Sequence, residues 1–138
     1  MFQSRKEVRQ VYFNVWQKMQ QKSLLETVEA IIADVIKLHP EYHALLDKRE
    51  NVKEKNFTPE DGQTNPFLHM GMHIAIREQA NANQPPGIQS AYQKILKKNT
   101  LHDAEHSMIK CLGQALWQAQ RDNTIPDDNA YLFCVKKI

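Results

Sequence analysis

The sequence predicts an all-α protein, a single-domain up-down helical bundle of five or six helices over residues 1–138. Apolar residues recur at intervals of three and four along most of the chain, which is the period of an amphipathic helix. The chain has only 4 Gly, and we find no segment with the alternation of a strand. Because each amphipathic face must be covered by another, a compact bundle is the expected architecture.

Two long helices are predicted in the N-terminal part of the chain. The capping-box pattern S-x-x-E occurs at residues 4–7, and an apolar stripe over residues 8–19 follows it. The same pattern occurs at residues 23–26, ahead of a second apolar stripe over residues 24–38. Each box predicts the start of the helix that follows.

Proline and glycine mark the next boundaries. Pro40 interrupts the second helix, and it also suits the first turn of a new short helix over residues 43–46. The charged stretch over residues 49–65 contains Asp-Gly and Pro turn signals and predicts a long loop. Asn65 is then the expected N-cap of a helix that has Pro66 at its first position.

The helix that starts at Pro66 and three further helices complete the prediction. The helix that starts at Pro66 should run to about Gln79, where the sequence NANQPPG ends it. Another is expected over residues 87–98. Thr100 should cap a long helix that runs to about Arg121, and a short last helix is expected over residues 127–137.

All histidines of the chain occur in pairs with the spacing H-x-x-x-H. Residues four apart share a helix face, and the faces that carry these pairs continue through apolar positions, so the rings should point inward. Antiparallel succession of the helices would bring the pairs to one end of the bundle. A cation bound between the neutral imidazoles would give the lone pair of each ring a partner there. The predicted metal ligands are His39, His43, His69, His73, His102 and His106.

Imidazole-rich sites with few carboxylates suit zinc, iron, nickel or copper, so the expected cofactor is a divalent transition metal such as zinc, iron or nickel. Glu105 lies about 60° around its helix from His102, where it suits a ligand, an orienting group or a base. As the base it is the candidate catalytic residue of a metal-dependent hydrolase or transferase, and iron would instead suggest redox chemistry. Whether the protein is an enzyme stays open.

The alternative is a non-catalytic helical interaction module in which the histidines form a structural polar cluster. A small-molecule ligand and a homodimer both stay open.

With 18 basic and 16 acidic residues, the charge of the chain does not indicate a nucleic-acid-binding protein. No apolar run reaches the roughly 18 residues of a membrane span. The N-terminus lacks a signal peptide, so a cytoplasmic location is expected, with Cys111 and Cys134 as reduced thiols because they match no paired spacing.

Several motifs together resemble a small proteobacterial family that is catalogued only as a domain of unknown function. These motifs are HPEYH, NPFLHMGMHIAIREQ, the QPPGI turn, HDAEH and LWQAQR followed by PDD and YL. The resemblance covers the chain from His39 to Tyr131. It implies a small cytoplasmic bacterial protein and brings no established activity, cofactor or catalytic residue.

Overall fold

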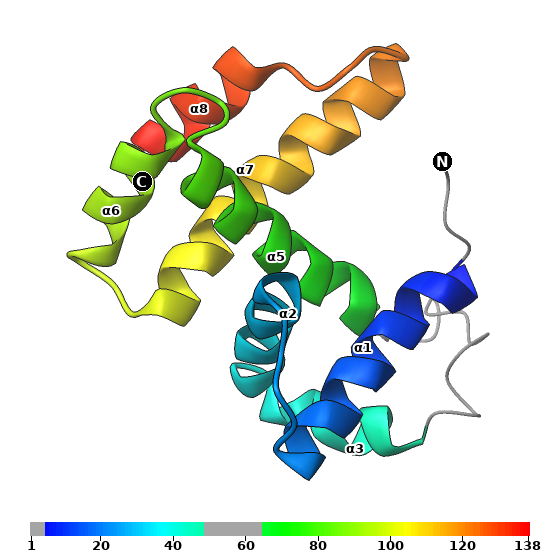
Figure 1. Cartoon of the computed structure of the whole chain (residues 1–138). Helices are drawn as coiled ribbons and strands as arrows, with labels where there is room; N and C mark the ends of the chain where they lie inside the picture. Colours follow the sequence, from blue (N-terminus) through cyan, green and yellow to red (C-terminus); the bar gives the residue numbers. More distant parts are fainter. Residues whose placement is uncertain (1–4, 49–64) are drawn as a thin grey trace. The chain divides into compact units, whose positions relative to one another are not determined.

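The computed structural model describes residues 5–48 and 65–138, and Figure 1 labels its helices. Seven α-helices and one short 3-10 helix occur in these ranges, and no strand occurs within them. The all-α prediction is therefore confirmed, with seven helices where five or six were expected. Among the described helices, none has both the length and the apolar character needed to cross a membrane. Apart from Asn65, the predicted 49–65 loop lies outside the described residues.

The chain divides into two compact units, Met1–Gly71 and Met72–Ile138. Helix α5 (Pro66–Ala82) supplies its first residues to the first unit and the remainder to the second. The two units are described separately below.

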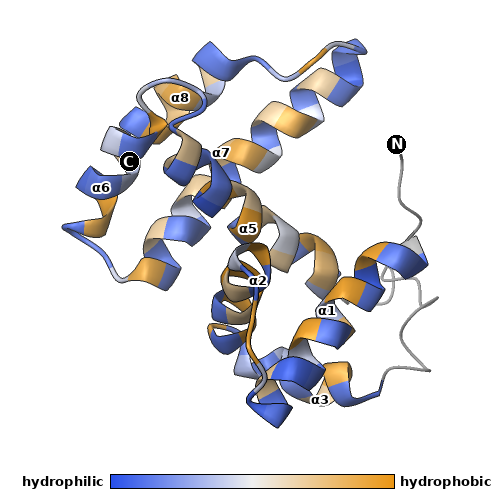
Figure 2. Cartoon of the chain, in the orientation of Figure 1, coloured by the Kyte–Doolittle hydropathy of each residue, from blue (hydrophilic) through white to orange (hydrophobic). Residues whose placement is uncertain are grey.

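The first unit is built on α1, with α2 and α3 packed against it. Val15 of α1 and both Val35 and Ile36 of α2 are completely buried. Phe67 at the start of α5 meets the rings of Tyr12 and Phe13 edge-on. Figure 2 shows hydrophobic and hydrophilic residues on opposite sides of these helices, as the periodicity predicts. The elements are α1 (Arg5–Gln21), α2 (Thr27–Lys37), η1 (Pro40–Tyr42) and α3 (His43–Asp47).

Helix α2 begins later than its predicted capping box. Its N-cap is Glu26, and the backbone N–H of Glu26 donates to Glu29 Oε1 at 3.0 Å. Lys18 Nζ also lies 2.7 Å from Oε2 of Glu29. The capping box of α2 is therefore formed by Glu26 and Glu29, three residues after the S-x-x-E pattern. Leu24 consequently lies outside the helix and is 96% exposed, so its assignment to the apolar stripe is wrong.

The proline signals are confirmed. Pro40 opens the 3-10 helix η1, and α3 follows directly from His43. At the start of α5, the side chain of Asn65 accepts hydrogen bonds from the backbone N–H groups of Phe67 and Leu68, at 3.0 and 3.2 Å. Asn65 therefore caps a helix whose first residue is Pro66, as the sequence predicts.

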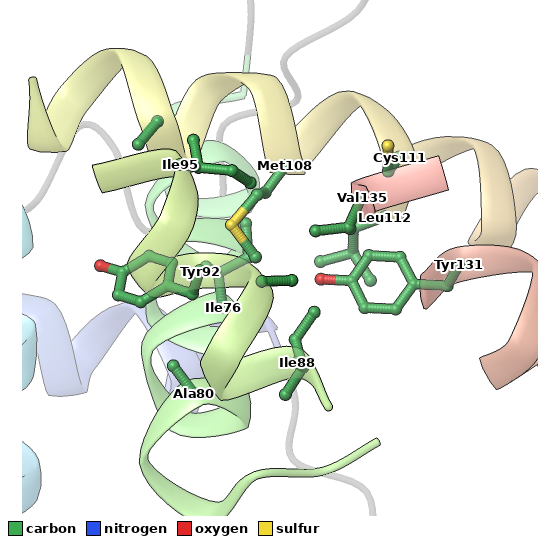
Figure 3. Close-up of a cluster of buried hydrophobic side chains, with 12 residues drawn as sticks. Ile76, Ala80, Ile88, Tyr92, Ile95, Met108, Cys111, Leu112, Tyr131 and Val135 are labelled. Atoms are coloured by element: carbon green, nitrogen blue, oxygen red, sulfur yellow. The ribbon is translucent and has the colours of Figure 1, made fainter. Parts of the chain in front are cut away.

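The second unit packs α8 against both α6 and α7. Figure 3 shows its core, in which Ile76 of α5, Ile88 of α6 and Met108 of α7 are completely buried. Tyr131 and Val135 of α8 complete this cluster. The helices are α6 (Ile88–Leu96), α7 (Leu101–Asp122) and α8 (Asp128–Lys136). All three lie within about two residues of their predicted bounds.

A disulfide joins Cys111 of α7 to Cys134 of α8. The expectation of two reduced thiols is therefore wrong. The cysteines are 23 residues apart in sequence and match no spacing rule, but α7 and α8 are adjacent antiparallel helices. This packing brings the two Cα atoms to 5.7 Å, within the range that a disulfide requires.

Thr100 fixes the start of α7, the helix that carries His102, Glu105 and His106 of the polar core described below. Its hydroxyl accepts a hydrogen bond from the backbone N–H of Asp103 at 3.2 Å. We expect Thr100→Ala to lower the free energy of unfolding by about 1 kcal/mol in urea denaturation, because this N–H loses its partner. Thr100→Ser is the matched control and should keep most of the stability. Equal losses in the two variants would contradict the capping role.

Candidate metal centre

Three histidines of the second unit bring their rings together. His73 comes from α5, and His102 and His106 come from successive turns of α7. The ring centroids are 3.9 Å apart for His102 and His106, 5.0 Å for His73 and His106, and 5.9 Å for His73 and His102. The second unit therefore contains a histidine cluster formed by two helices that are distant in sequence.

His73 is oriented by a buried carboxylate. Its Nδ1 lies 2.9 Å from Oε1 of Glu105, and both side chains are completely buried. Because a carboxylate only accepts hydrogen bonds, Nδ1 of His73 is the protonated nitrogen. In the neutral ring the lone pair is then on Nε2, the nitrogen on the opposite edge.

Glu105 is itself held by two further side chains. Arg77 Nε donates to Oε2 at 2.8 Å, and Arg77 Nη2 donates to Oε1 at 3.2 Å, which makes the pair bidentate. The hydroxyl of Tyr92, on α6, donates to Oε2 at 2.7 Å. Each carboxylate oxygen therefore accepts two hydrogen bonds, and the position of Glu105 is fixed from three directions.

The same contacts keep Glu105 ionised. Burial by itself raises the pKa of this carboxyl group, but the hydrogen bonds from His73, Arg77 and Tyr92 outweigh it and bring the pKa below its ordinary value. Burial and the neighbouring Glu105 charge raise the pKa of Tyr92 far above that of a phenol in water. Tyr92 therefore remains a hydrogen-bond donor, and Glu105 remains an acceptor.

These contacts favour one of the three roles that the sequence left open for Glu105. A general base needs access to a substrate or water, whereas Glu105 has no exposed surface and uses both oxygens within the protein. A carboxylate that accepts from the Nδ1–H of a metal-binding histidine is the usual orienting group of such sites. The geometry therefore fits a positioning residue acting through His73.

The cluster is accessible to solvent on the side of His102, whose side chain is 37% exposed. Nδ1 of His102 lies 3.9 Å from Oδ1 of Asp103, which is itself largely exposed. His106 is partly buried between this edge and His73. The start of α7, at His102, is therefore the exposed edge of the cluster.

Two other histidines meet in the first unit. The rings of His39 and His69 contact each other edge-on at 5.0 Å, and the ring of Tyr42 stacks on His39 at 5.3 Å. His39 is 1% exposed, and its Nδ1 donates to the backbone carbonyl of Val35 at 2.8 Å. His39 therefore carries its lone pair on Nε2 in the neutral ring, as His73 does.

His43 points elsewhere in the first unit. Its Nε2 donates to the carbonyl of Ile36 at 2.9 Å, and its ring packs on Trp16 at 4.6 Å. Trp16 in turn donates to Oδ1 of Asp47 at 2.8 Å. The 3-10 helix at Pro40 lies between His39 and His43, so these two residues do not share one helix face as the H-x-x-x-H spacing predicts.

Sequence spacing identified the histidines but only part of their surroundings. His73, His102 and His106 are brought together in the second unit, and His39 meets His69 in the first. Arg77 and Tyr92 were missed. Arg77 lies four residues after His73 on α5, so helical periodicity could have placed it on the same face. No sequence signal links Tyr92 to Glu105, because the hydrogen bond joins two separate helices.

The network gives a stability prediction. Tyr92→Phe removes a hydrogen bond to a buried charge, so we expect the free energy of unfolding to fall by about 1.5–3 kcal/mol in urea. Tyr131→Phe is the matched control, because the Tyr131 hydroxyl donates to the neutral Gln79 at 2.6 Å. That variant should lose only about 0.5–1.5 kcal/mol. A loss at Tyr92 no greater than at Tyr131 would argue against an ionised Glu105.

Comparisons with known proteins identify the family without naming an activity. A family model described as a domain of unknown function, DUF1841, matches residues 4–137. Neither the curated proteins nor the solved structures gave a match. The family match extends over nearly the whole chain and agrees with the predicted resemblance to a domain of unknown function. The chain therefore belongs to the DUF1841 family of domains of unknown function.

Proposed function

We propose that this protein binds a divalent transition metal ion through histidine nitrogens, with His73 and His106, whose ring nitrogens lie within 4.8 Å of each other, at the centre and His102 beside them. One observation carries the proposal, namely the buried Glu105 carboxylate that fixes the ring of His73 beside two further imidazoles. In metal sites of proteins, a histidine ligand usually donates its second ring N–H to a carboxylate, which fixes the tautomer and the orientation of the ring.

The donor set also suits such an ion chemically. Three neutral imidazoles offer nitrogen ligands of the kind that zinc, iron, nickel and copper prefer, whereas magnesium and calcium prefer oxygen. The charge of Glu105 is already balanced by Arg77 at 2.8 Å, so the carboxylate need not serve as a ligand. Its role is to keep the proton on Nδ1 of His73 and thereby leave Nε2 for the metal.

Metal chemistry would extend the proposal to a reaction. When bound, the ion supplies a Lewis acid for hydrolysis or group transfer, and iron also supplies redox chemistry. Within the chain, His102 lies at the exposed edge and His73 at the buried edge of the cluster. A substrate would therefore approach from the side of His102, and Glu105 would act on the reaction only by positioning His73.

Elemental analysis of protein purified without a histidine tag tests the proposal. We expect stoichiometric zinc, iron, nickel or copper in the wild-type chain. We expect it to be lost in His73→Ala and in His106→Ala, because each variant removes one of the two central ligand nitrogens. Added metal should stabilise the metal-depleted wild type by about 2.7 kcal/mol at a hundredfold excess over Kd.

His43→Ala is the matched control, since the Nε2 of His43 donates to a backbone carbonyl in the first unit. This variant should keep its metal. Absence of metal from the wild type, together with no thermal stabilisation by any of the four ions, would contradict the proposal and favour the interaction module.

The positioning role of Glu105 has its own test. We expect Glu105→Gln to weaken metal affinity about 10–100-fold in a competition titration, because a neutral amide orients His73 less strongly. Glu78→Gln, at an exposed carboxylate of α5, is the control and should leave the affinity unchanged. Comparison of the metal-free melting temperatures separates a positioning effect from loss of structure. Unchanged affinity in a folded Glu105→Gln protein would remove Glu105 from the site.

A further inference from the structure

A second candidate site lies in the second unit, in a groove between α7 and α8. The groove has a volume of about 540 Å³, and both cysteines of the disulfide line it. This volume is typical of sites that bind small molecules. A thiol in solution can approach a disulfide that lines an open groove, whereas it cannot approach one enclosed in a core.

The two sulfur-bearing residues differ in exposure. Cys111 is 5% exposed and belongs to the buried cluster of Figure 3, where it is grouped with Leu112 and Val135. Cys134 is only partly buried. We therefore expect a nucleophile that enters the groove to attack the disulfide at Sγ of Cys134, with Cys111 as the sulfur that leaves.

The charges along the groove indicate what kind of molecule would fit. Asp122 and Asp127 line it where α7 ends and α8 begins. Lys137 lines it beyond the other end of α8, three residues after Cys134. A molecule with both an ammonium and a carboxylate group would match this polarity, and the Lys137 ammonium would favour a thiolate approaching Cys134.

We propose that this groove is a thiol–disulfide exchange site for a small amino-acid or peptide thiol. The thiolate sulfur of the ligand attacks Cys134 Sγ and forms a mixed disulfide with it. The Cys111–Cys134 bond breaks, and its electron pair leaves on Cys111 Sγ, which takes up a proton. A second thiol then attacks the mixed disulfide, so that two thiols are oxidised to their disulfide and the protein disulfide is reduced.

Two single-cysteine variants test the assignment, with glutathione disulfide as the probe and intact mass as the readout. In Cys111→Ser, Cys134 should attack the probe and form a mixed disulfide with release of glutathione. In Cys134→Ser, the buried Cys111 should react severalfold more slowly. Equal rates, faster reaction at Cys111, or no reaction in either folded variant would overturn the proposal.

The charge argument is tested in the Cys111→Ser background. Adding Lys137→Glu should slow modification by glutathione disulfide severalfold, while the uncharged disulfide of 2-mercaptoethanol should react at a nearly unchanged rate. An equal effect on both probes would exclude recognition of a charged thiol.

The wild-type chain provides a test that needs no folded variant. Native protein is exposed to glutathione, quenched with an alkylating agent and mapped by mass spectrometry. We expect a mixed disulfide at Cys134 or alkylated cysteines under native conditions. A disulfide that opens only in denaturant, or only with a protein thiol such as thioredoxin, would overturn a site for small thiols.

Discussion

The hydrogen bond between His73 and Glu105 is the contact on which the polar core of this protein depends. An ionised carboxylate with no exposed surface is costly unless every oxygen finds a donor. His73, Arg77 and Tyr92 supply those donors from α5 and α6. The carboxylate in turn sets the tautomer and the orientation of His73. The stability of the buried Glu105 charge and the position of the lone pair on Nε2 of His73 therefore come from one set of contacts.

Helix α7 links this core to the rest of the second unit. His102 and His106 are one turn apart, and Glu105 lies beside them on the same side of the helix. Further along, Cys111 ties the helix covalently to α8. The polar cluster thus lies at the start of α7, and the disulfide lies near the middle of the same helix.

Much of this could be predicted from the sequence because it depends on local rules. Helical periodicity gave the fold class, and the caps at Asn65 and Thr100 are confirmed by their hydrogen bonds. The remainder depends on contacts between elements. Sequence spacing alone could not predict that Tyr92 contacts Glu105. It also could not predict that His43 faces away from His39 after Pro40, or that Cys111 and Cys134 lie close enough to form a disulfide. Each of these outcomes is decided by packing between helices.

The central claim is that Glu105 fixes which nitrogen of His73 carries the proton. Nitrogen NMR of the imidazole ring in the metal-free protein measures this directly, because protonated and lone-pair nitrogens have distinct chemical shifts. The account predicts a proton on Nδ1 and a lone pair on Nε2 of His73. A neutral ring with its proton on Nε2 would contradict it, since the hydrogen bond to Glu105 could not then exist as described.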